Sequence, residues 1–262
     1  MMIKKTFVLT AVLLTVCFNL FSQTAEEWKK LGNIAFEKAA QLGDTLAQQF
    51  LADEETSWKS NFISPDYKLI KKNIENKKSN FYYPILWDRF QQGDTTLTLE
   101  EKRHLYYGYL FHKNYASHAS SHDAKQVNEI LNKENPTKKE WEKLVSLLNT
   151  SLTTEPFCGK YIFFQGIAYD ALNKKVEAKI QFQKVQIIID ALLSTGNGLT
   201  KETAIHVISI SNEYDHLFFN ELSIRSQSLT SDYFDVLRLE PNEYGFEEMW
   251  FDVKQLFKSP WK

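Results

Sequence analysis

KYIFFQGIAYDALNKKVEAKIQFQKV, residues 160–185, carries the clearest repeat signal in this chain of 262 residues. Two small residues, Gly166 and Ala178, alternate along this stretch with two large aromatic ones, Tyr169 and Phe182. Antiparallel helices approach closely where small residues face each other, and aromatic rings then fill the space beside them. The spacing predicts a helical hairpin over residues 158–186.

This spacing resembles the tetratricopeptide pattern, although Ile162 and Gln165 stand where that pattern has its leading Trp and Leu. A second segment, FEKAAQLGDTLAQQFLA at residues 36–52, weakly resembles the helix-turn-helix core of a Sel1-type repeat. Solenoids need several stacked repeats, so we expect one tetratricopeptide-like hairpin and not a full array.

Helix start signals recur through the first two thirds of the chain. Thr98 with Glu101 and Thr137 with Glu140 have the spacing of capping boxes, in which each side chain bonds the other residue's backbone N–H. Two further starts are Ser64, as an N-cap followed by Pro65 in the first turn, and Pro84. We therefore expect a body of helices that ends at Leu193.

Gly196-Asn197-Gly198, in the turn at residues 194–198, is typical of a helix C-cap with positive φ. After this turn the period changes. Residues 204–210, AIHVISI, are apolar on both faces, which predicts a central strand. Residues 233–239 and 246–253 alternate and predict two more strands, and Tyr214 to Leu222 fits a short helix. The expected fold class is α+β: a mostly helical, tetratricopeptide-like body followed by a small antiparallel sheet.

The first 22 residues have the layout of a secretory signal peptide. Lys4 and Lys5 precede an uncharged apolar run that ends at Leu20, and we expect cleavage between Ser22 and Gln23. The run is shorter than the roughly 20 residues that span a bilayer. Two alternatives are a lipoprotein signal acylated at Cys17 and an uncleaved membrane anchor.

The expected divisions are the signal peptide at 1–22, an N-terminal helical segment at 23–60, the helical body at 61–200 and the β-rich unit at 201–262. The mature chain would have 262 − 22 = 240 residues and a formal charge of 29 − 33 = −4. A weakly acidic chain has no electrostatic reason to bind nucleic acid or anionic lipid. Its single cysteine, Cys158, could form no internal disulfide, so we expect a buried thiol.

Four strings together are similar to a family of exported bacterial proteins, domain-of-unknown-function family 4919. They are FYYPILWDRFQQGDTTLTLEEKRHLYYGYLF (81–111), STGNGLTKETAIHVISISNEYDHL (194–217), QSL (227–229) and EYGFEEMWFDVKQLF (243–257). The resemblance covers about residues 62–258 and implies a fold but no catalytic residue. It also implies an Asp where Asn197 stands, so any chemical role of that Asp is in doubt here.

One set of residues suggests acid–base chemistry. His206 with Glu202 or Glu213 could form an acid–base pair, and Ser194 or Ser209 could be the nucleophile. The alternative is a hydrogen-bonded core histidine, since no Gly-x-Ser-x-Gly elbow is present.

A second set suggests a metal site. His118 and His122 are four residues apart, with His112 or Asp123 as a third ligand and His104 nearby. The alternative is a polar, Ser-rich surface loop.

A third set suggests a groove for a sugar or peptide, because tyrosines lie beside carboxylates and an arginine. Its residues are Asp94, Thr96, Glu100, Arg103, Tyr106 and Tyr107. The alternative is a capped helix followed by an aromatic core.

The absence of a complete catalytic set favours a non-enzymatic module of the cell envelope that binds a protein or peptide and needs no cofactor. A hydrolase-like enzyme based on His206 is the alternative, and metal binding through His112, His118 and His122 is the third hypothesis. After removal of the signal peptide we expect no transmembrane helix, and a location in the periplasm, on the outer membrane or outside the cell.

Overall fold

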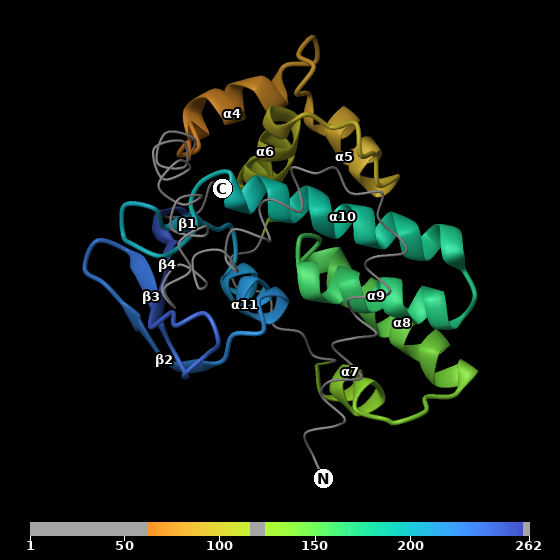
Figure 1. Cartoon of the computed structure of the whole chain (residues 1–262). Coiled ribbons are helices and arrows are strands. Elements are labelled where there is room, and N and C mark those ends of the chain that lie inside the picture. The colour runs from red at the N-terminus through yellow and green to blue at the C-terminus, as the bar shows by residue number, and fades with distance from the viewer. Residues whose placement is uncertain (1–61, 116–123, 259–262) are drawn as a thin grey trace, which may run out of the picture. The chain divides into compact units, whose positions relative to one another are not determined.

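A computed structural model describes residues 62–115 and 124–258, which form a helical body followed by a small sheet (Figure 1). The helices are α4 (Tyr67–Glu75), α5 (Tyr83–Gln91), α6 (Leu99–Gly108), η1 (Tyr109–Phe111, a 3₁₀ turn), α7 (Ala124–Leu131), α8 (Lys138–Thr154), α9 (Gly159–Ala171), α10 (Lys175–Leu193), α11 (Ile210–Phe219) and α12 (Lys254–Phe257). The strands are β1 (Ile205–His206), β2 (Ile224–Leu229), β3 (Phe234–Leu239) and β4 (Glu248–Asp252). The α+β prediction is confirmed.

Several predictions concern residues outside these ranges. They are the signal peptide with its cleavage between Ser22 and Gln23, the lipoprotein site at Cys17, and the Sel1-like segment at 36–52. Among the described helices, none combines the length and the apolar character that a bilayer crossing needs.

Both predicted capping boxes are present. Thr98 N donates to Glu101 Oε2 at 2.7 Å and Glu101 N donates to Thr98 Oγ1 at 3.3 Å. Thr137 and Glu140 exchange the same two bonds at the start of α8. Such caps each contribute about 1 kcal/mol, because they satisfy backbone donors that have no partner inside the helix.

The start of α4 corrects a prediction. The N-cap is Asp66, whose Oδ1 accepts from Leu69 N at 3.0 Å, and not Ser64. A carboxylate satisfies the free N–H groups and also interacts favourably with the positive end of the helix dipole. Ile70 and Ile74 are buried, as the predicted apolar face requires.

Helices α9 and α10 form the predicted hairpin, with Asn173 at φ 60° in the turn. A Cβ built on Gly166 of α9 would lie 2.7 Å from Phe182 Cε1 on α10, closer than real Cβ atoms come to a neighbour. The predicted close approach at Gly166 is therefore present. The likeness to a tetratricopeptide unit beyond this hairpin stays a prediction.

The helical body has two apolar centres. Leu144 and Leu148 of α8 pack with Ala168 of α9 and with α7. The other centre is aromatic: the Phe157 ring lies 5.1 Å from Phe90 and 5.3 Å from Tyr109 between ring centroids. Aromatic pairs at these separations add about 0.5–1.5 kcal/mol to the burial of their area. The loop before α9 is thus anchored in the body.

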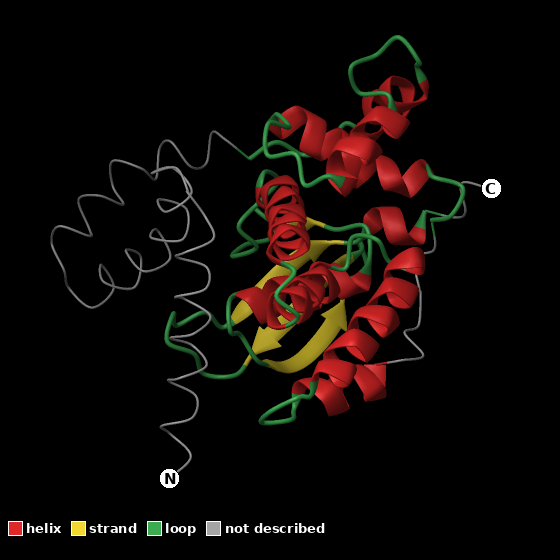
Figure 2. Cartoon of the chain, turned by 90° about the vertical axis from the view of Figure 1, so that its right-hand side faces the viewer, coloured by secondary structure: helices red, strands yellow, loops and turns green. Residues whose placement is uncertain are grey.

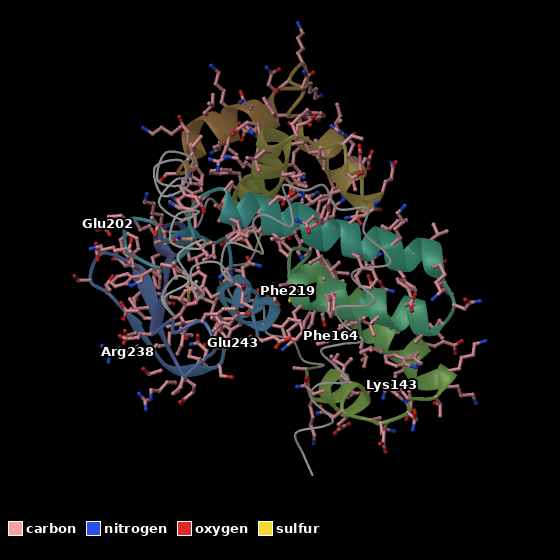
Figure 3. The ribbon with its side chains drawn as sticks, viewed as in Figure 1. Lys143, Phe164, Glu202, Phe219, Arg238 and Glu243 are labelled. Atoms are coloured by element: carbon pink, nitrogen blue, oxygen red, sulfur yellow. The ribbon has the colours of Figure 1, made fainter. Side chains whose placement is uncertain are left out.

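Aromatic rings also join α9 to α11. Phe163 and Phe164 of α9 contact Phe218 and Phe219 of α11, with centroids 5.4–6.0 Å apart, and Figure 3 labels Phe164 and Phe219 at this junction. On the sheet side of α11, the His216 ring lies 5.9 Å from Phe251 of β4. Figure 2 shows helices across one face of the sheet, and α11 is therefore the link between body and sheet.

The sheet has the order β1-β4-β3-β2. Strands β4, β3 and β2 pair antiparallel, but β1 pairs parallel with β4, with Ile205 opposite Phe251. The predicted antiparallel sheet is thus corrected to a mixed one. A parallel pair needs a crossover, which here runs through α11, β2 and β3.

The predicted central strand at residues 204–210 is also corrected. Strand β1 has two residues and lies at an edge, because Ser209 caps α11 and the helix begins at Ile210. Ile205, Val207 and Ile208 are nevertheless buried. An edge strand covered by helices has the same apolar pattern as a central strand, which explains the error.

Helix α10 ends at Leu193 as predicted, but its C-cap is Ser194 and not a glycine. Gly198, with φ 75°, lies in the following turn, where its carbonyl accepts from Trp250 N at 2.8 Å. The glycine therefore lets the turn approach β4 and does not end the helix.

We predict that Gly166→Ala destabilises the protein. Overpacking against Phe182 costs about 1–3 kcal/mol, whereas the higher helix propensity of alanine stabilises the helix by about 1 kcal/mol. The free energy of unfolding should therefore fall by about 1 kcal/mol. Urea denaturation measures the change. In a Phe182→Leu background the same substitution should be neutral or stabilising, and a stabilising effect in the wild-type background would contradict the close packing.

Candidate functional site

His206 lies at the junction of the sheet with α4 and α6. Its Nδ1 and the Tyr67 hydroxyl share a hydrogen bond of 3.2 Å, and its Nε2 lies 4.0 Å from Asp252 Oδ2. Its backbone is also held, since His206 N donates to Thr195 Oγ1 at 3.0 Å and the Tyr107 hydroxyl donates to His206 O at 3.2 Å. The side chain is 14% exposed, so it lies almost entirely inside the protein.

Burial keeps the imidazole of His206 neutral at pH 7. Burial lowers the pKa of His206, and Asp252 opposes this shift. Asp252 already forms an ion pair with Lys254, whose Nζ lies 2.8 Å from Oδ2. A separation of 4.0 Å from Nε2 is too long for a hydrogen bond. These contacts fit a hydrogen-bonded core histidine.

The other residues of the predicted acid–base set lie elsewhere. Glu202 is exposed at the outer margin of the sheet (Figure 3). Glu213 is fully buried on α11, where its Oε2 accepts from Gln227 Nε2 at 3.3 Å. Among the described residues, no hydrogen bond or ion pair joins either glutamate to His206.

The two predicted nucleophiles have structural partners. Ser194 Oγ accepts from Arg103 Nη1 at 2.6 Å and donates to Ala191 O. Ser209 Oγ accepts from Ser211 N at 3.3 Å and so caps α11. Each hydroxyl thus has a role in holding the backbone.

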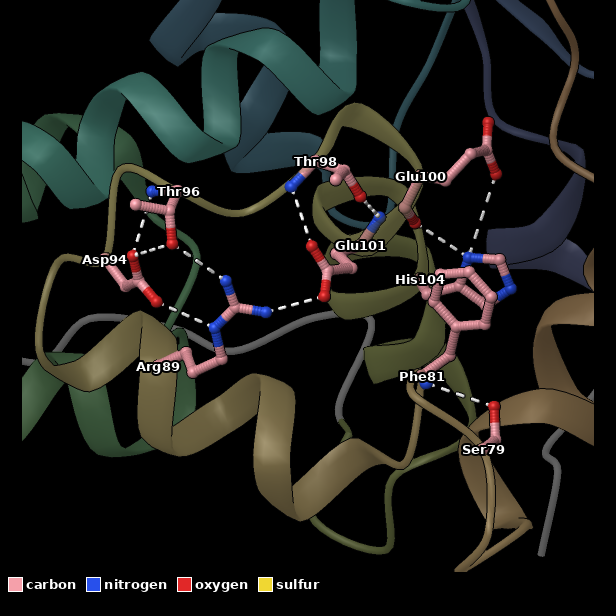
Figure 4. Close-up of polar contacts among 9 residues, drawn as sticks. All are labelled: Ser79, Phe81, Arg89, Asp94, Thr96, Thr98, Glu100, Glu101 and His104. Atoms are coloured by element: carbon pink, nitrogen blue, oxygen red, sulfur yellow. Dashed lines mark hydrogen bonds and ion pairs between the residues drawn. The ribbon is translucent and has the colours of Figure 1, made fainter.

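Two residues of the predicted groove, Asp94 and Thr96, belong to a closed network around Arg89 (Figure 4). The guanidinium donates to Asp94 Oδ2 at 2.7 Å, to Glu101 Oε1 at 2.6 Å and to Thr96 Oγ1 at 3.1 Å. Hydrogen bonds from Thr96, then from Arg89, lower the pKa of Asp94 to about 2. The sequence did not single out Arg89, which is the centre of the network and fixes the loop between α5 and α6.

The remaining groove residues belong to the interior. Tyr106 and Tyr107 are 0% exposed, and the Tyr106 hydroxyl donates to Asn212 Oδ1 at 2.8 Å. Arg103 is buried and donates to the carbonyls of Ile63 and Ser64 at 2.8 and 3.3 Å. The exposed carboxylate of Glu100 lies 3.2 Å from Arg103 Nε. The tyrosines are therefore core residues and present no surface to a ligand.

Some histidines of the predicted metal site lie outside the described residues, and the others pack against aromatic rings. His118, His122 and Asp123 lie outside the described residues. His104 stacks on Phe81 at 3.9 Å (Figure 4), and His112 stacks on Tyr109 at 5.5 Å. Within residues 62–115 and 124–258, no group of three or more His, Cys, Asp or Glu side chains is arranged to hold a metal ion.

A small hollow lies where α8 ends and α9 and α11 begin. It has a volume of about 20 Å³, roughly enough for one water molecule. Burial raises the pKa of Glu155, which lines the hollow and accepts from Ser209 Oγ at 3.5 Å. The other lining residues are Tyr109, Tyr115, Thr154, Pro156, Phe157, Cys158, Ile208, Ser211 and Asn212.

Beneath this hollow, Asp215 of α11 satisfies the start of α9. Its carboxylate accepts from Gly159 N at 2.6 Å and from Lys160 N at 3.1 Å. Burial raises the pKa of Asp215 to about 7, against the opposing effect of these N–H donors. The Cys158 thiol is buried as predicted, and burial together with Asp215 raises its pKa, so it remains protonated and unsuited to nucleophilic attack.

Sequence reasoning missed strand β2, which is an outer strand of the sheet. Within the described part of the chain, β2 pairs with β3 on one side and with no strand on the other. Thr230 N donates to Phe234 O at 2.8 Å, and bonding alternates along an antiparallel pair. The backbone groups of Gln227 and Leu229 therefore point outward. The four consecutive polar residues of IRSQSL hide the alternation that identifies a strand, so the polar turn that follows was the available signal.

Asn197 makes an Asx turn, in which its Oδ1 accepts from Leu199 N at 3.1 Å. An aspartate oxygen could accept the same bond. The position thus has a structural role that Asn fulfils.

Residues 68–260 match the model of a protein family described as a domain of unknown function (DUF4919). This match confirms the resemblance expected over residues 62–258. Neither a curated protein nor a solved structure matches the chain significantly.

We predict that Asp215→Ala lowers the free energy of unfolding by about 2–4 kcal/mol, because two buried N–H groups of α9 lose their acceptor. Urea denaturation followed by circular dichroism measures the loss. Asp232→Ala, which removes an exposed carboxylate paired with Lys201, is the matched control and should change stability little. Equal effects of the two substitutions would show that Asp215 does not hold the start of α9.

Proposed function

The chain belongs to the DUF4919 family, and because that description assigns no activity, we propose a function from the structure: a non-enzymatic module that binds an extended segment of a partner protein or peptide along strand β2. The observation that supports this proposal is the outer side of β2, which pairs with no strand among residues 62–115 and 124–258. An extended segment that pairs there adds a strand to the sheet, which is a common mode of peptide recognition.

The composition of β2 favours such pairing over protection of the edge. Natural edge strands are often blocked by Pro, by Lys or by a bulge. In β2 a register shift lies between Ile224 and Ser226, and Arg225 is near Glu240, with 4.0 Å between Nε and Oε1. The part beyond the irregularity, residues 226–229, contains neither Pro nor a charged side chain.

Side chains beside this edge offer apolar contacts to a partner. Leu229 is 48% exposed, and Tyr214 of α11 is 41% exposed while its hydroxyl donates to Gln227 Oε1 at 2.6 Å. A backbone hydrogen bond contributes about 0.5–1.5 kcal/mol net, so the few bonds available along β2 give weak affinity alone. The proposed partner therefore carries an apolar residue that reaches Leu229 or Tyr214.

The arrangement of His206 also supports a binding module over the hydrolase alternative. Catalysis would need His206, a carboxylate and a nucleophile within hydrogen-bond reach in an open site. Tyr67 instead occupies Nδ1 of His206, and Glu202 is exposed. The metal hypothesis depends on His118 and His122, outside the described residues.

We further propose that the protein is exported, with the partner in the cell envelope or outside the cell. The supporting observation is the signal-peptide layout of the first 22 residues. Mass spectrometry of the native protein should find a mature chain that begins at Gln23. An intact Met1 in a soluble cytosolic pool would overturn the proposal, and an acylated chain beginning at Cys17 would identify the lipoprotein alternative.

We predict that Leu229→Pro abolishes partner binding, because proline removes an outward N–H without removing a bond to β3. A photo-crosslinking residue at Ser228, with crosslinks located by mass spectrometry in the envelope fraction, reports pairing at this strand. Leu229→Ala, which keeps the N–H, is the matched control and should retain crosslinks in reduced yield. Equal crosslinking by the proline variant would refute strand addition, as would the absence of crosslinks from the protein that carries the crosslinker at Ser228 and keeps Leu229.

A further inference from the structure

Two carboxyl groups lie side by side between α11 and the sheet, beside the strand proposed to bind the partner. Glu213 of α11 is 0% exposed and Asp235 of β3 is 5% exposed. One amide bridges them: Gln227 Nε2 donates to Asp235 Oδ2 at 2.7 Å and to Glu213 Oε2 at 3.3 Å. This amide belongs to β2, so the carboxyl pair holds a side chain of the open strand.

No positive charge within the described part of the chain balances the pair. Among the described residues, no Lys, Arg or His forms an ion pair with either carboxyl group. Two buried carboxylates that share a site cannot both be ionised without a large cost, so one of them keeps its proton. Burial and the neighbouring Asp235 raise the pKa of Glu213 to about 9, and burial raises the pKa of Asp235.

Hydrogen bonding identifies the protonated group. Glu213 Oε1 is buried and receives no hydrogen bond from a donor group. A proton on Glu213 lets this carboxyl group donate to Asp235, which resolves the unsatisfied oxygen. Asp235 then accepts from both Glu213 and Gln227, as an ionised carboxylate can.

The groups that face the pair come from three elements. Asp235 lies on β3, the neutral Gln227 lies on β2, and the Tyr214 hydroxyl lies on α11. Burial raises the pKa of Tyr214, so its hydroxyl stays protonated and donates to Gln227 Oε1. This donation fixes the amide with its nitrogen toward the two carboxyl groups.

We infer that Glu213 and Asp235 share one proton at neutral pH and that the protonated pair, through its contact with Gln227, holds β2 against α11. We call this contact the latch. The latch follows from the contacts of these side chains alone. An effect of the latch on partner binding rests on the proposed function, because β2 is the strand proposed to bind the partner. Loss of the proton places two negative charges beneath Gln227 and loosens the hold of α11 on β2.

The direction of the pH effect follows from linkage. The pKa of Glu213 is about 9 in the folded protein against 4.5 for an ordinary glutamate, so between these values the folded state holds a proton that the unfolded state has released. Stability therefore decreases as pH rises through this range. One such proton changes Tm by about 3–5 °C per pH unit in a chain of this size.

The test compares the thermal unfolding of the wild type with that of Glu213→Gln at about pH 5, 7 and 9, the range that linkage defines. Gln keeps an N–H donor toward Asp235 but needs no proton. The variant should gain stability relative to the wild type as pH rises, whereas Glu142→Gln, at an exposed position on α8, should follow the wild type. EDTA in every sample excludes a divalent cation as the neutralising charge.

Asp235→Asn provides a second variant in case Glu213→Gln does not fold, and it should flatten the pH profile in the same way. Profiles of the folded variants that run parallel to the wild type would overturn the shared proton. Hydrogen exchange at residues 224–229 tests the latch itself: protection should fall near pH 9 in the wild type and persist in the variant. Neither readout uses a partner, so the latch and strand addition can fail separately.

Discussion

The carboxylate of Asp215 at the start of α9 is the contact on which the union of body and sheet depends. Helix α9 begins after Cys158, which supplies no side-chain cap. The free N–H groups of a buried helix start must find acceptors, and here they find one on α11, about 55 residues further along the chain. Because α11 also packs on β4, this carboxylate fixes the position of the sheet relative to the hairpin.

The relation between the two helices is reciprocal. Glu155 lies just before α9, and its carboxylate accepts from Ser209, the N-cap residue of α11. Each helix start therefore receives an acid from the other segment, and negative charge at a helix N-terminus is stabilised by the helix dipole. These contacts occupy the acids beside the small hollow between the two helix starts. The acids there have a structural role, although their residue types resemble those of an active site.

Sequence reasoning succeeded where a structure depends on residues close together in the chain. The capping boxes at Thr98 and Thr137, and the close approach at Gly166, need only local spacing. It failed for β1 and β2, because burial of Ile205 and the pairing of β2 with β3 depend on distant residues. The Glu213–Asp235 pair was missed for the same reason: its members come from different elements. The Arg89 network is local, within residues 89–101, and was missed because no spacing pattern marks a helix arginine as the partner of the loop that follows it.

The candidate sites in the sequence consist of side chains, whereas the proposed function depends on the backbone groups of β2. His206, Ser194 and Tyr107 have the residue types of catalysis or binding, yet the fold uses each of them to hold another segment. A side chain held in this way cannot reorganise around a ligand without loss of stability. The outward N–H and C=O groups of β2 have no such role within the described chain, and a backbone donor has no signature in residue type. The proposed partner binding at this edge would therefore need no motif of side chains, only a strand that the rest of the fold keeps in place.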